Sequence, residues 1–221
     1  LGSFEPRKPL ISNIGDFEEK GVRYIVKDPD QFEGKDMVIS GGGDSALDWT
    51  VNLHPLAKKL TLLHRRDDFR AAPDTINKMR KLVADGEMQL EIAQLKELRS
   101  ENGVLKTVAV KGETGEYDIE CDTLLAFYGL TMKLGPVANF GINLDRNLIP
   151  VDTEKFETDV AGIFAIGDIN TYPGKLKLIL SGFHEAALMA QQAFRYVHPE
   201  RKLRFQYTTS SSELQGKLGV T

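Results

Sequence analysis

The sequence predicts an α/β fold built on a parallel β-sheet, and three features of its first half predict it. The apolar run over 36–40 has the length and composition of a buried strand. A glycine turn follows it at once, and 44–53 then carries apolar residues at helical spacing. A second apolar run over 60–63 completes the unit. The order strand, turn, helix, strand is typical of parallel sheets, because the helix returns the chain to its starting edge.

The predicted helix has defined limits. Ala46, Trp49 and Leu53 fall at i, i+3 and i+7, which places them along one face. Pro55 ends the helix, because the residue before a proline avoids the helical region. Asp44 stands at the start, where its side chain is expected to cap the helix by accepting a backbone hydrogen bond.

The glycine turn carries the most specific motif of the first half. Gly41, Gly43 and Ala46 fit the pattern G-x-G-x-x-G/A of dinucleotide-binding folds. Glycines there permit a sharp turn and let the main chain approach a pyrophosphate. The helix start at Asp44 and Ser45 adds free N–H groups and the positive end of the helix dipole. The alternative interpretation is that three glycines form only a turn.

Basic side chains after the second strand indicate which coenzyme the turn would bind. An NAD site usually has a carboxylate about 20 residues after the glycines, where it bonds the ribose hydroxyls. Here that place holds Arg65 and Arg66, with Arg70 close behind. Guanidinium groups bind phosphate oxygens through paired hydrogen bonds, whereas a carboxylate would repel them. The sequence therefore favours NADPH over NADH, unless Asp67 and Asp68 pair with the arginines as a solvated charge cluster.

The remainder of the first half is predicted to be structural. A helix is expected over 73–84, and a buried strand over 124–127. Between them, turn signals separate four short segments that read as an antiparallel meander. These four segments are 88–92, 95–100, 104–111 and 116–120.

The second half has a different pattern. The apolar run over 160–166 is predicted to be a strand that ends in Gly167-Asp168. A glycine there lets the backbone approach a ligand, and Asp168 would bond a sugar hydroxyl. A helix is expected over 181–197, and its first turn would favour negative charge nearby. The alternative for Asp168 is a simple turn or helix cap.

Composition and charge argue against several function classes. The 221 residues are 41% hydrophobic and 27% charged, which is ordinary for a globular protein. The formal net charge of -4 and the lack of a basic run argue against a nucleic-acid partner. The one cysteine, Cys121, excludes an internal disulfide and a Cys-x-x-Cys redox pair, and it fits a cytoplasmic protein. The four histidines are too scattered to suggest a metal site.

Three motifs together resemble those of the thioredoxin-reductase-like flavoproteins. They are Gly41-Gly42-Gly43-Asp44-Ser45-Ala46, His64-Arg65-Arg66-Asp67-x-Phe69-Arg70-Ala71 and Gly162-x-Phe164-Ala165-x-Gly167-Asp168. The resemblance implies two three-layer, Rossmann-like FAD/NAD(P)-binding domains, with the NADPH domain inserted in the FAD domain. On this plan the segments are 1–7 (the end of the first FAD segment and a hinge), 8–126 (the NADPH domain) and 127–221 (the C-terminal FAD segment and its extension). The rest of the FAD domain would precede Leu1, so the chain is expected to be a fragment.

The missing dithiol indicates the activity within this family. Thioredoxin reductases carry a Cys-x-x-Cys shortly before the glycine turn, but the corresponding stretch 21–28 has no cysteine. The chain therefore resembles the ferredoxin/flavodoxin–NADP reductases of this fold. That resemblance implies FAD and NADPH as cofactors, ferredoxin or flavodoxin as the partner, and a homodimer. The alternatives are a thioredoxin or other disulfide reductase, and a non-catalytic NADPH-binding module.

The resemblance also implies roles for individual residues. The backbone of the glycine turn would hold the NADPH pyrophosphate at Gly41, Gly42, Gly43, Asp44 and Ser45. The 2′-phosphate would be bound by Arg65, Arg66 and Arg70. No side chain is expected to act as a nucleophile, because the reaction is cofactor chemistry.

A second set of residues is implied for the flavin. Asp168 would bond the FAD ribitol, and the backbone of Lys177 and Leu178 would approach the ring. Tyr207 would stack on the flavin across the dimer, with Thr208 near its reactive nitrogen. The alternative for Tyr207 is a hydrophobic anchor for a loose tail.

Overall fold

A computed structural model of the protein describes residues 3–203 and 207–219. These residues cluster into two compact units, and one of them comprises residues 4–131. The other comprises the N-terminal residues up to Ser3 and the residues from Met132 onward. Within the described ranges, no helix has both the length and the apolar character that a bilayer crossing needs.

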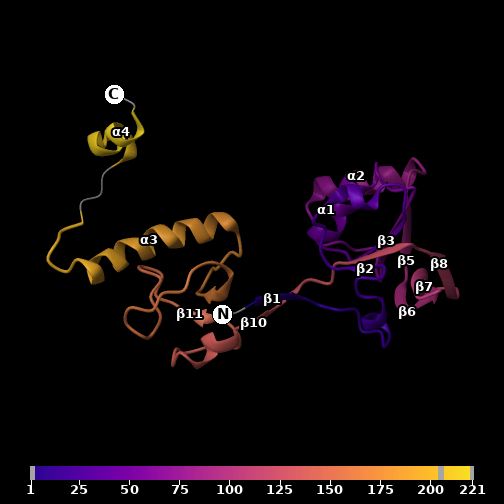
Figure 1. The fold of residues 1–221 in the computed structure, drawn as a ribbon, viewed down its shortest axis with the longest axis horizontal. Helices are drawn as coiled ribbons and strands as arrows, with labels where there is room; N and C mark the ends of the chain where they lie inside the picture. The colour runs from indigo at the N-terminus through magenta and orange to yellow at the C-terminus, as the bar shows by residue number, and fades with distance from the viewer. Residues whose placement is uncertain (1–2, 204–206, 220–221) are drawn as a thin grey trace. The chain divides into compact units, whose positions relative to one another are not determined.

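A parallel sheet of five strands organises residues 4–131, so the predicted α/β fold is confirmed (Figure 1). In order across the sheet, the strands are β2 (Val22–Arg23), β9 (Thr123–Ala126), β3 (Asp36–Ser40), β4 (Lys59–His64) and β5 (Gln89–Ile92). The helices α1 (Asp44–Leu53) and α2 (Pro73–Ala84) follow β3 and β4, with the predicted bounds. Because β9 lies on the other side of β3 from β4, the strand order reverses between β3 and β9.

Two cores cover the two faces of this sheet, because successive side chains of a strand point to opposite faces. Met37 and Ile39 of β3 belong to the core that includes α1 and α2. Val38 between them belongs to the other core, with Cys121 and the strands that follow β5. Figure 1 shows α1 and α2 on one side of the sheet and β6, β7 and β8 on the other. The unit therefore has three layers.

The meander that forms the third layer has three strands rather than the predicted four. They are antiparallel and comprise β6 (Gln94–Glu101), β7 (Val104–Gly112) and β8 (Gly115–Glu120). The fourth predicted member, 88–92, instead contains β5, which pairs in parallel with β4. The physical reason is the connection through α2, which returns the chain to the starting edge of the sheet.

The unit that contains the residues from Met132 onward has little regular sheet. The strands β11 (Ile149–Pro150) and β12 (Asn170–Thr171) pair in parallel. A separate two-stranded sheet pairs β1 (Ser3–Pro6) with β10 (Leu130–Lys133). The helical elements of the C-terminal half are η3 (Gly135–Asn139), η4 (Gly167–Ile169), α3 (Ile179–Val197), η5 (Thr208–Ser210) and α4 (Ser212–Leu218).

The strand predicted over 160–166 does not form, and this prediction is wrong. The segment turns back at Gly162, whose φ is +81°. The Ile163 N–H donates to the Val160 carbonyl at 3.1 Å, and the Ala165 N–H donates to Phe156 at 3.1 Å. Because these backbone groups bond locally, the segment forms an isolated antiparallel bridge between Phe164 and Glu157 in place of a strand. Gly167 and Asp168 therefore lie in η4, at the end of a turn-rich segment.

Candidate functional site

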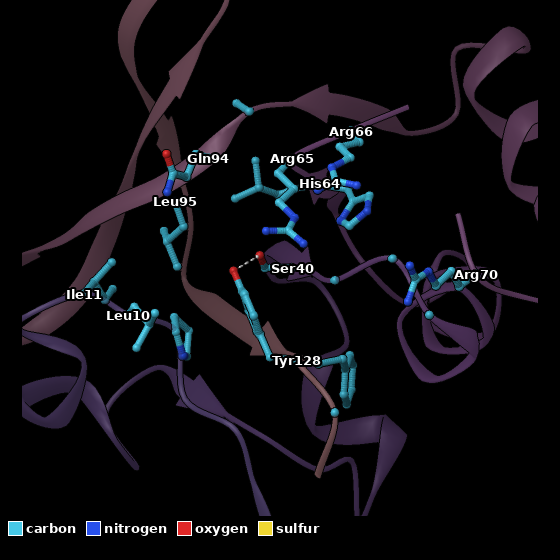
Figure 2. Close-up of a pocket in the computed structure, with 18 of the residues that line it drawn as sticks. Leu10, Ile11, Ser40, His64, Arg65, Arg66, Arg70, Gln94, Leu95 and Tyr128 are labelled. Carbon is cyan, nitrogen blue, oxygen red and sulfur yellow. Dashed lines mark hydrogen bonds between the residues drawn. The ribbon is translucent and has the colours of Figure 1, made fainter. Parts of the chain in front are cut away.

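A cavity of about 540 Å³ opens at the carboxyl ends of the parallel strands (Figure 2). Ligands of open α/β sheets bind at this edge, and the volume is within the range of small-molecule sites. The cavity wall is built by the ends of β3 and β4 and by the residues after β9. The segments in the wall are 8–11, 40–43, 63–66, 93–95 and 127–129, with Asp68 and Arg70.

The glycine turn leaves no room for side chains at its first two positions. A Cβ atom on Gly41 would lie 2.5 Å from the Phe127 carbonyl oxygen, and its φ is +154°. A Cβ atom on Gly42 would lie 2.4 Å from Nε2 of His64. At Gly43 the nearest atom would be 3.8 Å away, so that position is open. The turn therefore has the close packing and the accessible main chain that a pyrophosphate site needs.

Asp44 and Ser45 follow the turn, but their side chains do not line the cavity. The cap of α1 is Gly43, so the prediction that Asp44 caps the helix is wrong. Because Asp44 is already the first helical residue, its carboxylate faces outward and accepts the Ala72 N–H at 3.0 Å. The first-turn N–H groups of α1 receive no side-chain cap, which leaves them available to an anion.

Arg65, Arg66 and Arg70 all line the cavity, as the sequence predicted. Asp67 does not neutralise them, because its carboxylate pairs with Arg80 at 2.8 Å. Throughout residues 3–203 and 207–219, no ion pair engages any of the three arginines. Within the described residues, the cavity wall therefore carries three guanidinium groups that form no ion pair, together with the carboxylate of Asp68.

The three guanidinium groups are held at different places along the wall. In Figure 2, Arg65 extends toward Ser40 and Tyr128, whereas Arg66 lies near His64. The backbone of Arg70 is bonded to the turn, since the Arg70 main-chain N–H donates to the Gly42 carbonyl at 2.7 Å. This bond joins the loop that carries Arg70 to the glycine turn.

The imidazole ring of His64 packs against Gly42 of the glycine turn. Burial lowers the pKa of this imidazole, a hydrogen bond with the Asp68 backbone partly offsets that shift, and the adjacent Arg65 and Arg66 lower the pKa further. Its ring lies 5.4 Å from the ring of Phe69. Because the imidazole stays uncharged near neutral pH, it can pack under Gly42 without adding another cation.

Ser40 and Tyr128 line the cavity but were missed by sequence reasoning. Their hydroxyl oxygens lie 2.8 Å apart, although 88 residues separate them in sequence. A usable signal existed, because both stand at the carboxyl ends of predicted strands, where ligands of parallel sheets bind.

In the second unit, Asp168 is exposed in η4, and the turn that carries it is held by Glu185 of α3. The Glu185 side chain is fully buried. It accepts bonds from the Gly167 N–H at 2.7 Å, from Asn170 Nδ2 at 2.9 Å and from the Tyr172 hydroxyl at 2.9 Å. Lys175 completes the set as an ion pair. Sequence reasoning missed Glu185, because one glutamate on an apolar helix carries no signal of its partners.

The donors around Glu185 decide its charge. Burial by itself would raise the pKa of this carboxyl, but Lys175, the Gly167 N–H, Tyr172 and Asn170 together hold the pKa below its usual value. A buried carboxylate needs such a complete set of partners. Glu185 therefore stays ionised and fixes the turn that presents Asp168.

The other residues predicted for the flavin are placed only in part. Lys177 and Leu178 are exposed just before α3, and Leu178 is its N-cap residue. Tyr207 is also exposed, and Thr208 begins η5. The tail residues that join them to α3 include 204–206, which lie outside the described ranges. The roles of these four residues stay predictions.

A second carboxylate, Glu157, ties the turn-rich segment to α3. Its Oε1 accepts bonds from the Tyr196 hydroxyl at 2.5 Å and from the Gly162 N–H at 2.7 Å. Lys155 Nζ lies 3.0 Å from Oε2. The bond from Tyr196, followed by that from Gly162, lowers the pKa of Glu157 to about 2.

We expect this carboxylate to make the second unit acid-sensitive. Since the folded pKa lies below the ordinary value of 4.5, the stabilisation is complete above that value and is lost as the pH falls toward about 2. Urea unfolding of the wild type and of Glu157→Gln between pH 3 and 7 gives the contribution of this carboxylate to the free energy of unfolding at each pH. The difference in free energy of unfolding should be larger at pH 6 than at pH 3. A difference that is independent of pH would contradict the assignment, and Glu154→Gln, on an exposed neighbour, is the control.

The amino-acid sequence was compared with a family model and with curated proteins. The family model described as "Pyridine nucleotide-disulphide oxidoreductase" matches residues 1–193. A ferredoxin--NADP reductase of Parvibaculum lavamentivorans is 66% identical over 99% of this chain and 64% of its own length. A ferredoxin--NADP reductase of Beijerinckia indica is 65% identical over the same shares. The chain thus spans about 64% of the length of these curated relatives.

Solved structures show the same fold. A thioredoxin reductase of Lactococcus lactis matches with a TM-score of 0.74 and 24% identity, over 89% of this chain and 64% of that one. A thioredoxin reductase of T. acidophilum matches with a TM-score of 0.75 and 23% identity, over 88% and 64%. At these identities the likeness concerns the arrangement of the backbone alone.

Proposed function

Because the chain belongs to the pyridine nucleotide-disulphide oxidoreductase family, we propose that it is part of an FAD-dependent ferredoxin–NADP reductase. The reaction would transfer electrons between NADPH and a ferredoxin or flavodoxin through FAD. The observation that carries the proposal is the cavity beside the glycine turn, whose wall holds Arg65, Arg66 and Arg70, none of which forms an ion pair within the described chain. Such a wall suits a coenzyme that carries a phosphate on its adenosine ribose.

The residues of the cavity would bind NADPH in two parts. The main chain of Gly42 and Gly43, with the first turn of α1, would hold the pyrophosphate. Arg65, Arg66 and Arg70 would bind the 2′-phosphate through charge-assisted hydrogen bonds. No proton transfer by a side chain is required here, since these residues bind and orient the coenzyme.

The second unit would hold part of the flavin. FAD supplies, when bound, the exchange between two-electron and one-electron transfer. The residues present here fit the ribitol part of FAD. Asp168 would accept a hydrogen bond from a ribitol hydroxyl, and Glu185 holds the turn that carries Asp168 by accepting the Gly167 N–H. Lys177 and Leu178 would approach the ring through their backbone, Tyr207 would stack on it, and Thr208 would lie near its reactive nitrogen. Support for these four roles comes from the family resemblance.

The proposed domain plan follows from the same resemblance. Residues 8–126 would form the NADPH domain, and 127–221 would form the C-terminal segment of the FAD domain. The surface around the start of α3 supports a longer FAD domain, because several large apolar side chains there are exposed. They are Leu176, Leu178, Ile179, Leu180 and Phe183. A group of large exposed apolar side chains this close in sequence is normally covered by further protein.

Two observations bear on the electron acceptor: the names of the relatives and the cysteine content of the chain. The relatives described above are named ferredoxin reductases, although they are longer than this chain. Cys121 is buried, and burial raises the pKa of its thiol to about 12. A disulfide substrate would need an exposed, ionisable dithiol. We therefore propose a one-electron carrier as the acceptor, in a cytoplasmic homodimer.

The visible spectrum and the choice of acceptor test this function. The purified natural gene product should be yellow, should lose its colour when NADPH is added without oxygen, and should then reduce ferredoxin or flavodoxin. A colourless protein that still binds NADPH would show a non-catalytic coenzyme-binding module instead. Reduction of thioredoxin in place of ferredoxin would assign the protein to the disulfide reductases.

A further inference from the structure

Two hydroxyl groups meet where the strand order of the sheet reverses. Ser40 is the last residue of β3, and Tyr128 stands two residues after the end of β9. Neighbouring strands whose connections leave in opposite directions open a crevice at their carboxyl ends, and ligands of such sheets cross there. The 2.8 Å contact between the Ser40 and Tyr128 hydroxyls bridges this crevice (Figure 2).

The local backbone explains why the Tyr128 ring reaches back over the sheet. Ala126 lies opposite Ser40 in the register of β3 and β9, and the Phe127 N–H donates to the Ser40 carbonyl at 2.8 Å. Directly after the tyrosine, Gly129 adopts a φ of +86°, and its carbonyl accepts the Arg7 N–H at 2.9 Å. The backbone on either side of Tyr128 is therefore held by hydrogen bonds, and the ring itself is held by its contact with Ser40.

Tyr128 is exposed at the cavity wall, whereas Ser40 lines the wall but is almost fully buried. The exposed fraction is 39% for Tyr128 and 2% for Ser40. Burial raises the pKa of Tyr128, while Ser40 and Arg65 lower it to a smaller extent. The phenol thus keeps its proton at neutral pH. When the Ser40 hydroxyl donates to the phenol oxygen, the phenolic proton is free to bond an oxygen of a ligand.

The positions of the glycine turn and of Arg66 determine which way the bound coenzyme would run across the sheet. The pyrophosphate turn follows β3, and Arg66 follows β4, on the side of β3 opposite to β9. The phosphorylated adenosine half would therefore lie over the ends of β4 and β5. The remaining half must extend from the turn toward β9, which is where the Tyr128 hydroxyl lies.

We propose that the Ser40–Tyr128 hydroxyl pair binds the nicotinamide-side ribose phosphate of the coenzyme. This inference rests on the proposed function, because it assumes that NADPH occupies the cavity. Tyr128 supplies the hydrogen bond to the ligand, and Ser40 positions the phenol. The competing interpretation is a structural bond between β3 and β9 that no ligand contacts.

Two ligands separate these interpretations, because one of them lacks the nicotinamide half. Adenosine 2′,5′-bisphosphate carries the adenosine, the 2′-phosphate and one phosphate of the pyrophosphate, whereas NADP⁺ carries both halves. Isothermal titration of the 221-residue chain gives a Kd for each. In Tyr128→Phe, the Kd for NADP⁺ should rise about tenfold, as expected for a lost hydrogen bond to a charged group. The Kd for adenosine 2′,5′-bisphosphate should change by less than about twofold.

Two further variants make the result specific. Ser40→Ala should raise the Kd for NADP⁺ by a smaller factor than Tyr128→Phe does, because the Tyr128 ring loses the bond that positions it. The Kd for adenosine 2′,5′-bisphosphate should stay unchanged in Ser40→Ala. Tyr117→Phe is the matched control: its hydroxyl donates to Glu91 at 2.6 Å on the meander, outside the cavity wall. That variant should bind both ligands as the wild type does.

The outcomes are distinct. Equal weakening of both ligands in Tyr128→Phe would identify a structural bond and overturn the inference, and so would an unchanged Kd for NADP⁺. In either case the binding of adenosine 2′,5′-bisphosphate by the wild type would still support the proposed coenzyme. A wild-type chain that binds neither ligand would refute the proposed coenzyme and this inference together.

Discussion

Replacing Arg65 and Arg66 together with alanine should raise the Kd for NADPH by about 100-fold and the Kd for NADH by less than about threefold. The 2′-phosphate is the only group that distinguishes the two coenzymes. Each guanidinium contributes charge-assisted hydrogen bonds to it, and such bonds are worth roughly 1.5–3 kcal/mol apiece. Titration of the chain with each coenzyme, followed by the change in NAD(P)H fluorescence, measures both constants.

A control is available within the same unit. Arg99 of β6 pairs with Asp118 on the meander and lies outside the cavity wall. Arg99→Ala removes one positive charge from the same domain, so it corrects for the general change in electrostatic potential. Its Kd for NADPH should stay within about twofold of the wild type. If the Kd values for NADPH and for NADH rose by equal factors in the Arg65→Ala/Arg66→Ala variant, the assignment of these arginines to the 2′-phosphate would be refuted.

Gly41→Ala should have the largest effect on stability. Its φ of +154° disfavours a side chain, and the new Cβ would lie 2.5 Å from the carbonyl oxygen of Phe127. That oxygen belongs to the backbone after β9, so the clash can be relieved only if β3 and β9 separate. We expect a loss of about 3 kcal/mol in the free energy of unfolding of residues 4–131. Urea unfolding, followed by far-UV circular dichroism, measures the loss.

Gly43→Ala provides the contrast, because a Cβ there would find its nearest atom 3.8 Å away. The folded chain should therefore keep its stability within about 1 kcal/mol. Binding of NADP⁺ should nevertheless weaken, since the new methyl group stands where the main chain would approach the pyrophosphate. Comparable unfolding midpoints for the two variants would contradict the packing described at Gly41.

Local patterns predicted the nucleotide-binding unit well. The bounds of α1 and α2 agree with the structure, because apolar spacing and Pro55 define them within a few residues. The glycines and the arginines line the cavity as expected, since both follow directly from the ends of β3 and β4. The strand predicted over 160–166 failed because local turn bonds around Gly162 compete with a ladder. The segment 88–92 was assigned to the wrong sheet, because an isolated strand carries no information about its partner.

The amino-acid sequence alone determined the turn, the helix after it and the positive charge beside it, because each depends on residues that are near neighbours along the chain. Only the tertiary structure decided that Tyr128 meets Ser40, and that Glu185 gathers Gly167, Asn170 and Lys175 around a buried charge. The Ser40–Tyr128 contact joins residues 88 positions apart. It forms because β9 lies beside β3 in the sheet, and that pairing depends on how the whole unit closes around its two cores.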